Sequence, residues 1–274
     1  MKNLKIFIIA TALAFFSCEK VVDIEVPSIA PKLVIDANFN VFFDETPVTA
    51  NTDIKLSLSA DYFDIEIPAV ADATVFVTNT TDNTIITYNH SNNGTYSAIN
   101  AFIPEDNVSY ELTVIYNGQT YKGNATKIKS TPFIDAFQGD ETLFSGEEIE
   151  VKVSFKDDEN AENYYLFNFT NNLYLTIEDR FFNGTDYNFS FFYEEDDIEL
   201  PTNATIQMAG ISKDYYTYFR ILSTQSGQSG GGPFEAVPSA LLGNIVNTTD
   251  DANYPLGYFH ISETDTFNLD LIEK

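Results

Sequence analysis

The sequence has no tryptophan, one cysteine and two histidines in 274 residues. A single cysteine excludes an intramolecular disulfide, so packing and hydrogen bonds alone must stabilise the fold. His90 and His260 are too few to supply the Cys and His ligands that a zinc site takes, even with the one thiol. We therefore expect neither a disulfide framework nor a zinc site, and we predict no cofactor.

Basic residues are also scarce. The chain carries 14 Lys and Arg against 41 Asp and Glu, which gives a formal net charge of −27. So acidic a surface repels the phosphates of nucleic acid and the headgroups of anionic lipid. We expect no nucleic-acid partner.

Long apolar runs are missing as well. The most apolar stretch, Ile6 to Phe16, is shorter than the roughly 20 residues that cross a bilayer as a helix. It follows Lys2 and Lys5 and stops at Ser17, which is the layout of a secretory signal. We predict a signal peptide over residues 1–17.

Cys18, the only cysteine, stands where this signal ends. The stretch resembles a bacterial lipoprotein signal peptide, in which the thiol at this position is diacylated and begins the mature chain. This predicts lipidation of Cys18; the alternative is an ordinary signal peptide cut near Ser17. Pro27 and Pro31 interrupt the residues that follow, so we interpret 18–31 as an extended tether.

What the chain has in abundance is Phe and Tyr, 24 and 16 residues, together with many Val, Ile and Thr. This mixture favours strands. Seven short β-rich runs occupy residues 32–39, 53–60, 73–80, 83–89, 94–99, 109–116 and 119–128. Asn117-Gly118 between the last two suits a type I′ hairpin turn. For residues 32–130 we predict an immunoglobulin-like or fibronectin-like β-sandwich.

A second β-rich domain is expected over residues 131–274, after the break at Thr131-Pro132. Its run from Ile149 to Lys156 alternates apolar with polar residues, and the stretch 164–193 is densely aromatic. Ser212 as N-cap and apolar residues at helical spacing predict one short helix near 213–224. The predicted fold class is mostly β, a sandwich followed by a β-rich domain with one helix.

No motif supports catalysis. Residues 227–231 read G-x-S-x-G around Ser229, and Asp250 and His260 follow in the chain order of an α/β-hydrolase triad. That motif requires a strand-to-helix turn in a βαβ fold, which the strand pattern excludes. The acidic runs 157–160, 194–199 and 250–251 lack calcium-loop spacing and suit a solvated surface better than a metal site. We expect a protein that is not an enzyme.

Several segments in succession carry a family resemblance: Cys18-Glu19-Lys20, PKLVIDANF (31–39), ENYYLFNF (162–169), YYTYFRIL (215–222), Pro233-Phe234, Asn244-Ile245 and Gly257-Tyr258-Phe259. Together they resemble the DUF4249 lipoproteins of Bacteroidota over nearly the whole mature chain. The resemblance implies a lipid-anchored accessory protein of the outer membrane, facing the cell exterior. It also implies a SusC-like TonB-dependent barrel as partner, and no catalytic residues.

The aromatic residues suggest where such a partner would bind. We predict an interface that includes Tyr165, Phe167, Phe181, Phe182, Phe234, Tyr258 and Phe259, in the aromatic stretch and in the long segment 233–259. A glycan or peptide ligand is a second use for these rings. The alternative function is that of a structural subunit of an outer-membrane assembly or envelope complex.

Overall fold

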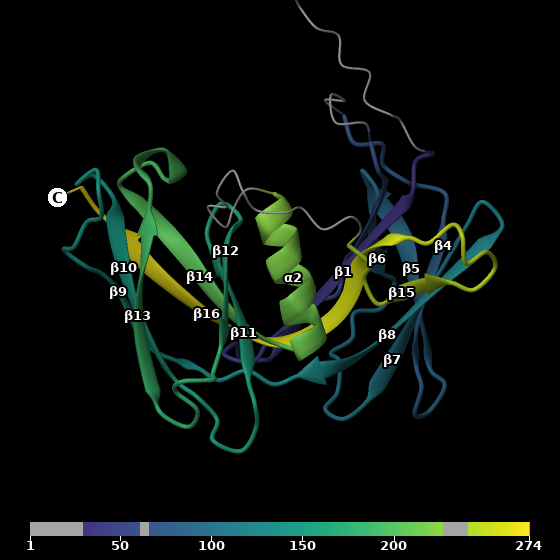
Figure 1. Cartoon of the computed structure of the whole chain (residues 1–274). Coiled ribbons are helices and arrows are strands. Elements are labelled where there is room, and N and C mark those ends of the chain that lie inside the picture. The colour runs from purple at the N-terminus through teal and green to yellow at the C-terminus, as the bar shows by residue number, and fades with distance from the viewer. Residues whose placement is uncertain (1–29, 61–65, 227–240, 274) are drawn as a thin grey trace, which may run out of the picture. The chain divides into compact units, whose positions relative to one another are not determined.

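A computed structural model describes residues 30–60, 66–226 and 241–273 (Figure 1). Within these residues there are sixteen strands, one α-helix and a single 3₁₀ turn. The prediction of a mostly β protein with one helix is confirmed. Residues from Pro31 to Lys274 form one compact unit. The predicted division at residue 130 stays a prediction.

The seven predicted β-rich runs all form strands, and one short strand escaped prediction because it has only three residues. The strands are β1 (Leu33–Phe42), β2 (Thr49–Asn51), β3 (Ile54–Leu58), β4 (Thr74–Asn79), β5 (Ile85–Asn92), β6 (Thr95–Ala98), β7 (Ser109–Tyr116) and β8 (Gln119–Ile128). The Asn117-Gly118 turn has φ values of 49° and 73°. Both are positive, as a type I′ turn requires, so this prediction is confirmed.

The remaining elements complete the fold. They are β9 (Phe133–Gln138), β10 (Ile149–Lys156), β11 (Tyr164–Phe169), β12 (Leu173–Glu178), β13 (Asp186–Tyr193), η1 (Glu195–Asp197), β14 (Thr202–Ile211), α2 (Lys213–Gln225), β15 (Ile245–Asn247) and β16 (Leu256–Leu271). The helix spans almost the predicted residues. The final strand begins at Leu256 and is 16 residues long.

Strand β16 joins the two halves of the chain. Thirteen strands form one sheet in the order β12-β11-β14-β16-β1-β3-β6-β5-β4-β7-β8-β15, with β2 on the side of β1. The first part of β16 runs parallel to β1, and its second part runs antiparallel to β14. It also bridges β8 at Ile261 and Ser262. Strands β13, β10 and β9 form a separate sheet of three.

Two main hydrophobic cores follow from this arrangement. The first lies among β1 and β3–β8 and takes Phe259 and Ile261 from β16. The second lies between β11, β14 and the three-stranded sheet and takes Leu269 and Leu271 from the other end of β16. One strand therefore stabilises both cores, and the β-rich layers pack in the manner of sandwiches.

The alternation in β10 predicts the buried residues Val151, Val153 and Phe155 correctly but misplaces Glu150. Its side chain is fully buried and accepts hydrogen bonds from the Ser190 hydroxyl (2.6 Å) and the Glu141 amide (2.8 Å). The Ser190 donor lies on β13, 40 residues away, which is a long-range feature that alternation does not encode. Asp157, expected in a solvated turn, is likewise buried and accepts from the Tyr165 hydroxyl at 2.6 Å.

Candidate functional site

A hollow lined by polar and aromatic side chains lies where helix α2 meets β1, β12 and β16. Its outer part, which we call the tyrosine cleft, has a volume of about 420 Å³. The described residues that line it are Val34, Asp36, Asn38, Tyr174, Tyr215, Tyr218, Phe219, Leu222, Ser223, Ser226, Gly257 and Tyr258. This volume lies in the range of small-molecule sites.

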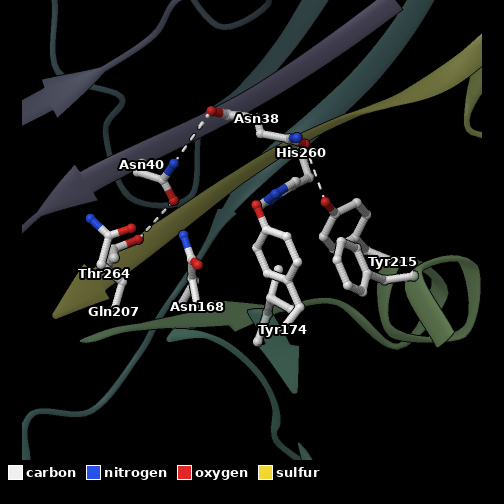
Figure 2. Close-up of a pocket in the computed structure, with 11 residues that line it drawn as sticks. Asn38, Asn40, Asn168, Tyr174, Gln207, Tyr215, His260 and Thr264 are labelled. Atoms are coloured by element: carbon white, nitrogen blue, oxygen red, sulfur yellow. Dashed lines mark hydrogen bonds between the residues drawn. The ribbon is translucent and has the colours of Figure 1, made fainter. Parts of the chain in front are cut away.

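A smaller inner part, the amide pocket, continues from the cleft and has a volume of about 110 Å³. It shares Asn38, Tyr174, Tyr215 and Phe219 with the cleft. Its other described lining residues are Asn40, Leu166, Asn168, Gln207, Ala209, His260 and Thr264. Figure 2 shows the amide side chains along the sheet, with Tyr174 and Tyr215 at one end of the row.

The period of two along β1 creates this polar face. Ile35, Ala37 and Phe39 are buried in the first core, so the intervening Asp36 and Asn38 point to the opposite face. Strand register adds the other amides, because Asn168 on β11 stands opposite Gln207 on β14. The pocket is thus built from five different strands and the helix.

The polar side chains of β1 and α2 form a connected hydrogen-bond chain. The Tyr215 hydroxyl donates to Asn38 Oδ1 at 3.3 Å, and Asn38 Nδ2 donates to Asp36 Oδ1. Deeper in the pocket, Thr264 Oγ1 donates to Asn40 Oδ1 at 2.9 Å (Figure 2). Asn168 Oδ1, in contrast, is buried without a hydrogen-bond partner. An oxygen of this kind is stabilised by a donor that enters the pocket.

The helix holds the tyrosines in place. Ser212 caps its N-terminus, accepting from the Tyr215 amide at 3.2 Å. Tyr215 and Phe219 then pack with Tyr164 and Tyr258 in a third, smaller apolar cluster. This cluster explains why β11 is apolar on both faces, since one face meets the second core and the other meets the helix.

His260 is buried at the base of the pocket, and its pKa falls to about 3 because burial disfavours the imidazolium. Ser262 Oγ donates its only hydrogen to Gly210 O (2.6 Å), and it also lies 3.1 Å from His260 Nδ1. Nδ1 must therefore be the donor in that contact, which leaves Nε2 unprotonated. A histidine held neutral in this way is a poor general acid or base near pH 7.

Burial also raises the pKa of Asp36, although the hydrogen bond from Asn38 opposes the effect. Its side chain is exposed at the mouth of the cleft, but the concave wall displaces part of the surrounding water. The pKa of Tyr218 rises to about 12, first through burial and then through the negative charge of Asp36. The tyrosine rings are therefore neutral at physiological pH.

Most of the predicted interface residues are enclosed by the chain itself. Tyr165, Phe167, Phe182, Tyr258 and Phe259 are all buried, whereas Phe181 is 88% exposed. Phe234, Ser229 and Cys18, the residue predicted to be lipidated, lie outside the described residues. Phe181 alone thus offers a described surface to a partner, and Tyr258 serves the cleft as one of its walls.

The other sequence candidates lie apart from one another. His90 is on β5, and its Nε2 accepts from the Gly94 amide at 3.2 Å within a hairpin. Across the described ranges, no three His, Cys, Asp or Glu residues are placed to share a metal ion. Residues 30–60, 66–226 and 241–273 also contain no helix with the length and hydropathy of a membrane span.

The family of the chain follows from its similarity to known protein families. A family model described as "Domain of unknown function (DUF4249)" matches residues 19–268. The chain belongs to the DUF4249 family. A search of curated proteins found no match.

Two motifs that carried the family resemblance have structural roles beside the cleft. Asn244 donates to the carbonyl of Phe259 (2.7 Å) and accepts from the amide of the same residue (2.9 Å). Gly257 has φ +97°, and a Cβ there would lie 2.0 Å from the Ile35 carbonyl oxygen. Both contacts fix the start of β16, which carries Tyr258 and His260 into the site.

Sequence reasoning missed the cleft, although one signal was present. In PKLVIDANF the polar residues Asp36 and Asn38 interrupt a strand at alternate positions, which indicates a polar face. Nothing local shows that Gln207 and Thr264 share that face, because they reach it through the pairing of β14 with β16 and of β16 with β1, the latter across more than 200 residues.

Proposed function

We propose that the protein is a non-catalytic ligand-capturing lipoprotein of the outer membrane, anchored through Cys18 and acting beside a SusC-like TonB-dependent barrel. The observation that carries ligand capture is the tyrosine cleft with its amide pocket. It is concave, is walled by aromatic rings, and offers several hydrogen-bonding groups at its base.

The chemistry of the site supports binding over catalysis. His260 has its pKa near 3, and Ser262 is fully buried with its hydroxyl hydrogen committed to Gly210. Neither is suited to act as base or nucleophile. Labelling of Ser229 by a fluorophosphonate probe would contradict this part of the proposal.

The barrel as partner and the outer-membrane location rest on the signal-peptide pattern and on the family resemblance. Phe181 adds a point of contact, because it is 88% exposed next to Arg180, whose guanidinium lies 5.4 Å from its ring centroid. A large exposed aromatic residue of this kind is typical of an interface.

The test is to extract outer membranes in mild detergent, pull down the tagged protein and identify its companions by mass spectrometry. We expect a TonB-dependent barrel, with less recovered from Phe181→Ser. Phe144→Ser is the matched control, since Phe144 is also fully exposed but lies on the loop between β9 and β10. Recovery of assembly factors without a transporter would favour the structural alternative.

A further inference from the structure

The tyrosine cleft has a single charged group among its described lining residues, the carboxylate of Asp36. None of the ion pairs between described residues involves it. Lys55 stands across from Asp36 in the register of β1 with β3, yet the two side chains form no ion pair. The one hydrogen-bond partner found for the carboxylate is the neutral amide of Asn38. Among the described residues, no cation therefore lies within ion-pair distance of this carboxylate.

Five aromatic rings surround the same space. Tyr258 lies 4.8 Å from Tyr215 and 4.9 Å from Tyr218 between ring centroids, and Tyr174 lies 5.2 Å from Phe219. Burial raises the pKa of Tyr174, Tyr215 and Tyr218, and the charge of Asp36 is the next cause for each. The negative charge of Asp36 is therefore close enough to these tyrosine hydroxyls to affect their ionisation within the same cleft.

These observations discriminate between ligand classes. An anion would meet Asp36, no basic lining residue among those described, and a chain of net charge −27. A neutral ligand would displace water from Asp36 and leave the carboxylate without a countercharge. A cation gains both the carboxylate and the faces of the rings, whose quadrupoles attract positive charge.

We propose that the tyrosine cleft binds an organic cation, an alkylammonium or guanidinium group, with Asp36 as its charged partner and the tyrosine rings as its walls. This inference rests on the proposed ligand-capturing function and specifies the ligand class. The amide pocket receives the adjoining polar part of the ligand, which can donate a hydrogen bond to the unpaired Asn168 Oδ1. The cation belongs either to a free amine or to a Lys or Arg side chain of a peptide.

The test is calorimetry on the detergent-solubilised full-length protein with four probes: Nα-acetyl-lysine methylamide, butylammonium, Nα-acetyl-norleucine methylamide and glucose. We expect the lysine derivative to bind at least tenfold more tightly than the neutral norleucine derivative. Its affinity should fall several-fold between 50 and 500 mM NaCl, since salt screens the attraction at the open mouth of the cleft. Tighter binding of the lysine derivative than of butylammonium indicates a peptide source, and equal binding indicates a free amine.

Three variants sharpen the result. Asp36→Asn should remove the tenfold preference, whereas Asp53→Asn removes the same charge from an exposed position outside the cleft and should retain it. Tyr218→Leu should weaken the cationic probes at least fivefold, and Tyr218→Phe, which keeps the ring, should not. Loss of folding is excluded by requiring the thermal transition of each variant to match the native one.

Three outcomes would overturn the inference. One is equal binding of the lysine and norleucine derivatives, and another is binding of glucose that is lost in Tyr218→Leu. Either would show that the cleft binds neutral ligands, and the proposed ligand-capturing function would still hold. Absence of heat with both cationic probes would also reject the cation. The pull-down of the barrel tests the proposed partner separately, because its result does not depend on which ligand the cleft binds.

Discussion

At the scale of single residues, the site depends on positions whose neighbours are distant in sequence. Gly257 is the clearest case, because its backbone lies against the Ile35 carbonyl of β1 and has a positive φ. Any side chain there must displace main-chain atoms of a central strand. The glycine of the Gly-Tyr-Phe motif therefore has a steric reason to be glycine.

We expect Gly257→Ala to destabilise the protein by about 2 kcal/mol or more, from the strained φ and the clash with Ile35. The measurement is urea unfolding followed by circular dichroism. Gly146→Ala is a suitable control, since Gly146 also has a positive φ (+81°) but a Cβ there meets no atom within 4 Å. An equal loss in the two variants would show that the close approach to Ile35 contributes nothing.

His260 predicts a pH dependence of stability. Its folded pKa of about 3 lies below the ordinary value of 6.5, so the unfolded chain takes up the proton first as pH falls. The contribution of neutral His260 to the free energy of unfolding is fully present well above pH 6.5, and it declines by about 1 kcal/mol per pH unit between pH 6 and 5. We expect His260→Gln to have a flatter profile over that range.

The difference between the native protein and His260→Gln gives the contribution of the histidine to the pH dependence of stability. Asp179 and Asp265 have raised pKa values through burial, so their contributions run in the opposite direction, but they are the same in both proteins. Parallel profiles for the two proteins would mean that His260 is accessible to protons in the folded state.

At the scale of elements, local sequence explains much of what forms. The helix α2 begins after a capping serine, and the hairpin of β7 and β8 turns on Asn-Gly. Both were predictable because the signals lie within a few residues of one another. The three-residue strands β2 and β15 gave no comparable signal, since each exists through its pairing with a longer strand.

The β7–β8 turn gives a test of backbone strain alone. A Cβ at Gly118 would meet no atom within 4 Å, so a substitution there acts through its φ of +73°. We expect Gly118→Val to lower the free energy of unfolding by about 1–2 kcal/mol and Gly118→Asn to lower it by less, because Asn tolerates this conformation. Thermal melts of the two variants check this, and identical midpoints would argue against the strain.

The aromatic stretch 164–193 shows how much the arrangement of the sheets decides. Its density of Phe and Tyr suggested a surface for a partner, and in the structure rings of this stretch pack between two sheets of the same chain. Phe169 on β11 stacks on Phe191 of β13 with 3.9 Å between ring centroids, and the ring centroids of Phe167 and Phe189 are 5.1 Å apart. No local pattern shows that β11 and β13 belong to different sheets.

At the scale of the whole molecule, β16 makes the two large cores interdependent. Phe259 fills the first core, and Leu271 fills the second. Because one continuous strand of 16 residues serves both, neither core can keep its packing when the strand detaches.

We therefore expect a single cooperative unfolding transition. Phe259→Ala and Leu271→Ala should each lower its midpoint, with costs of about 3–5 and 2–5 kcal/mol. Differential scanning calorimetry checks this by comparing calorimetric with van't Hoff enthalpies. Two separate transitions, each sensitive to one substitution only, would show instead that the cores are independent.

The proposed membrane attachment also concerns the whole chain. We expect Cys18→Ser to release the protein from membranes, because acyl chains contribute about 0.8 kcal/mol per buried CH₂ and the variant has no thiol to acylate. Fractionation and immunoblotting measure it, with Ser17→Ala as a control that leaves the thiol in place. A variant that still sediments with outer membranes would contradict lipid anchoring.

The sequence by itself determined the class of the protein. Composition led us to expect no disulfide, zinc site or nucleic-acid partner, alternation and turn residues predicted the strands, and a capped aromatic segment predicted the helix. Its succession of motifs resembled the DUF4249 family, to which the chain belongs. These features are decided by neighbours within a few residues, or by totals over the chain.

Only the tertiary structure decided which residues form a site. The parallel pairing of β1 with β16 brings Asn38 beside His260 across more than 200 residues, and α2 then folds Tyr215 over them. It likewise decided that Phe259 is core and that Asp36 opens to a cleft. The physical reason is strand register. The pairing partners of a strand decide which residues of other strands share a face with its side chains, and no local sequence pattern identifies those partners.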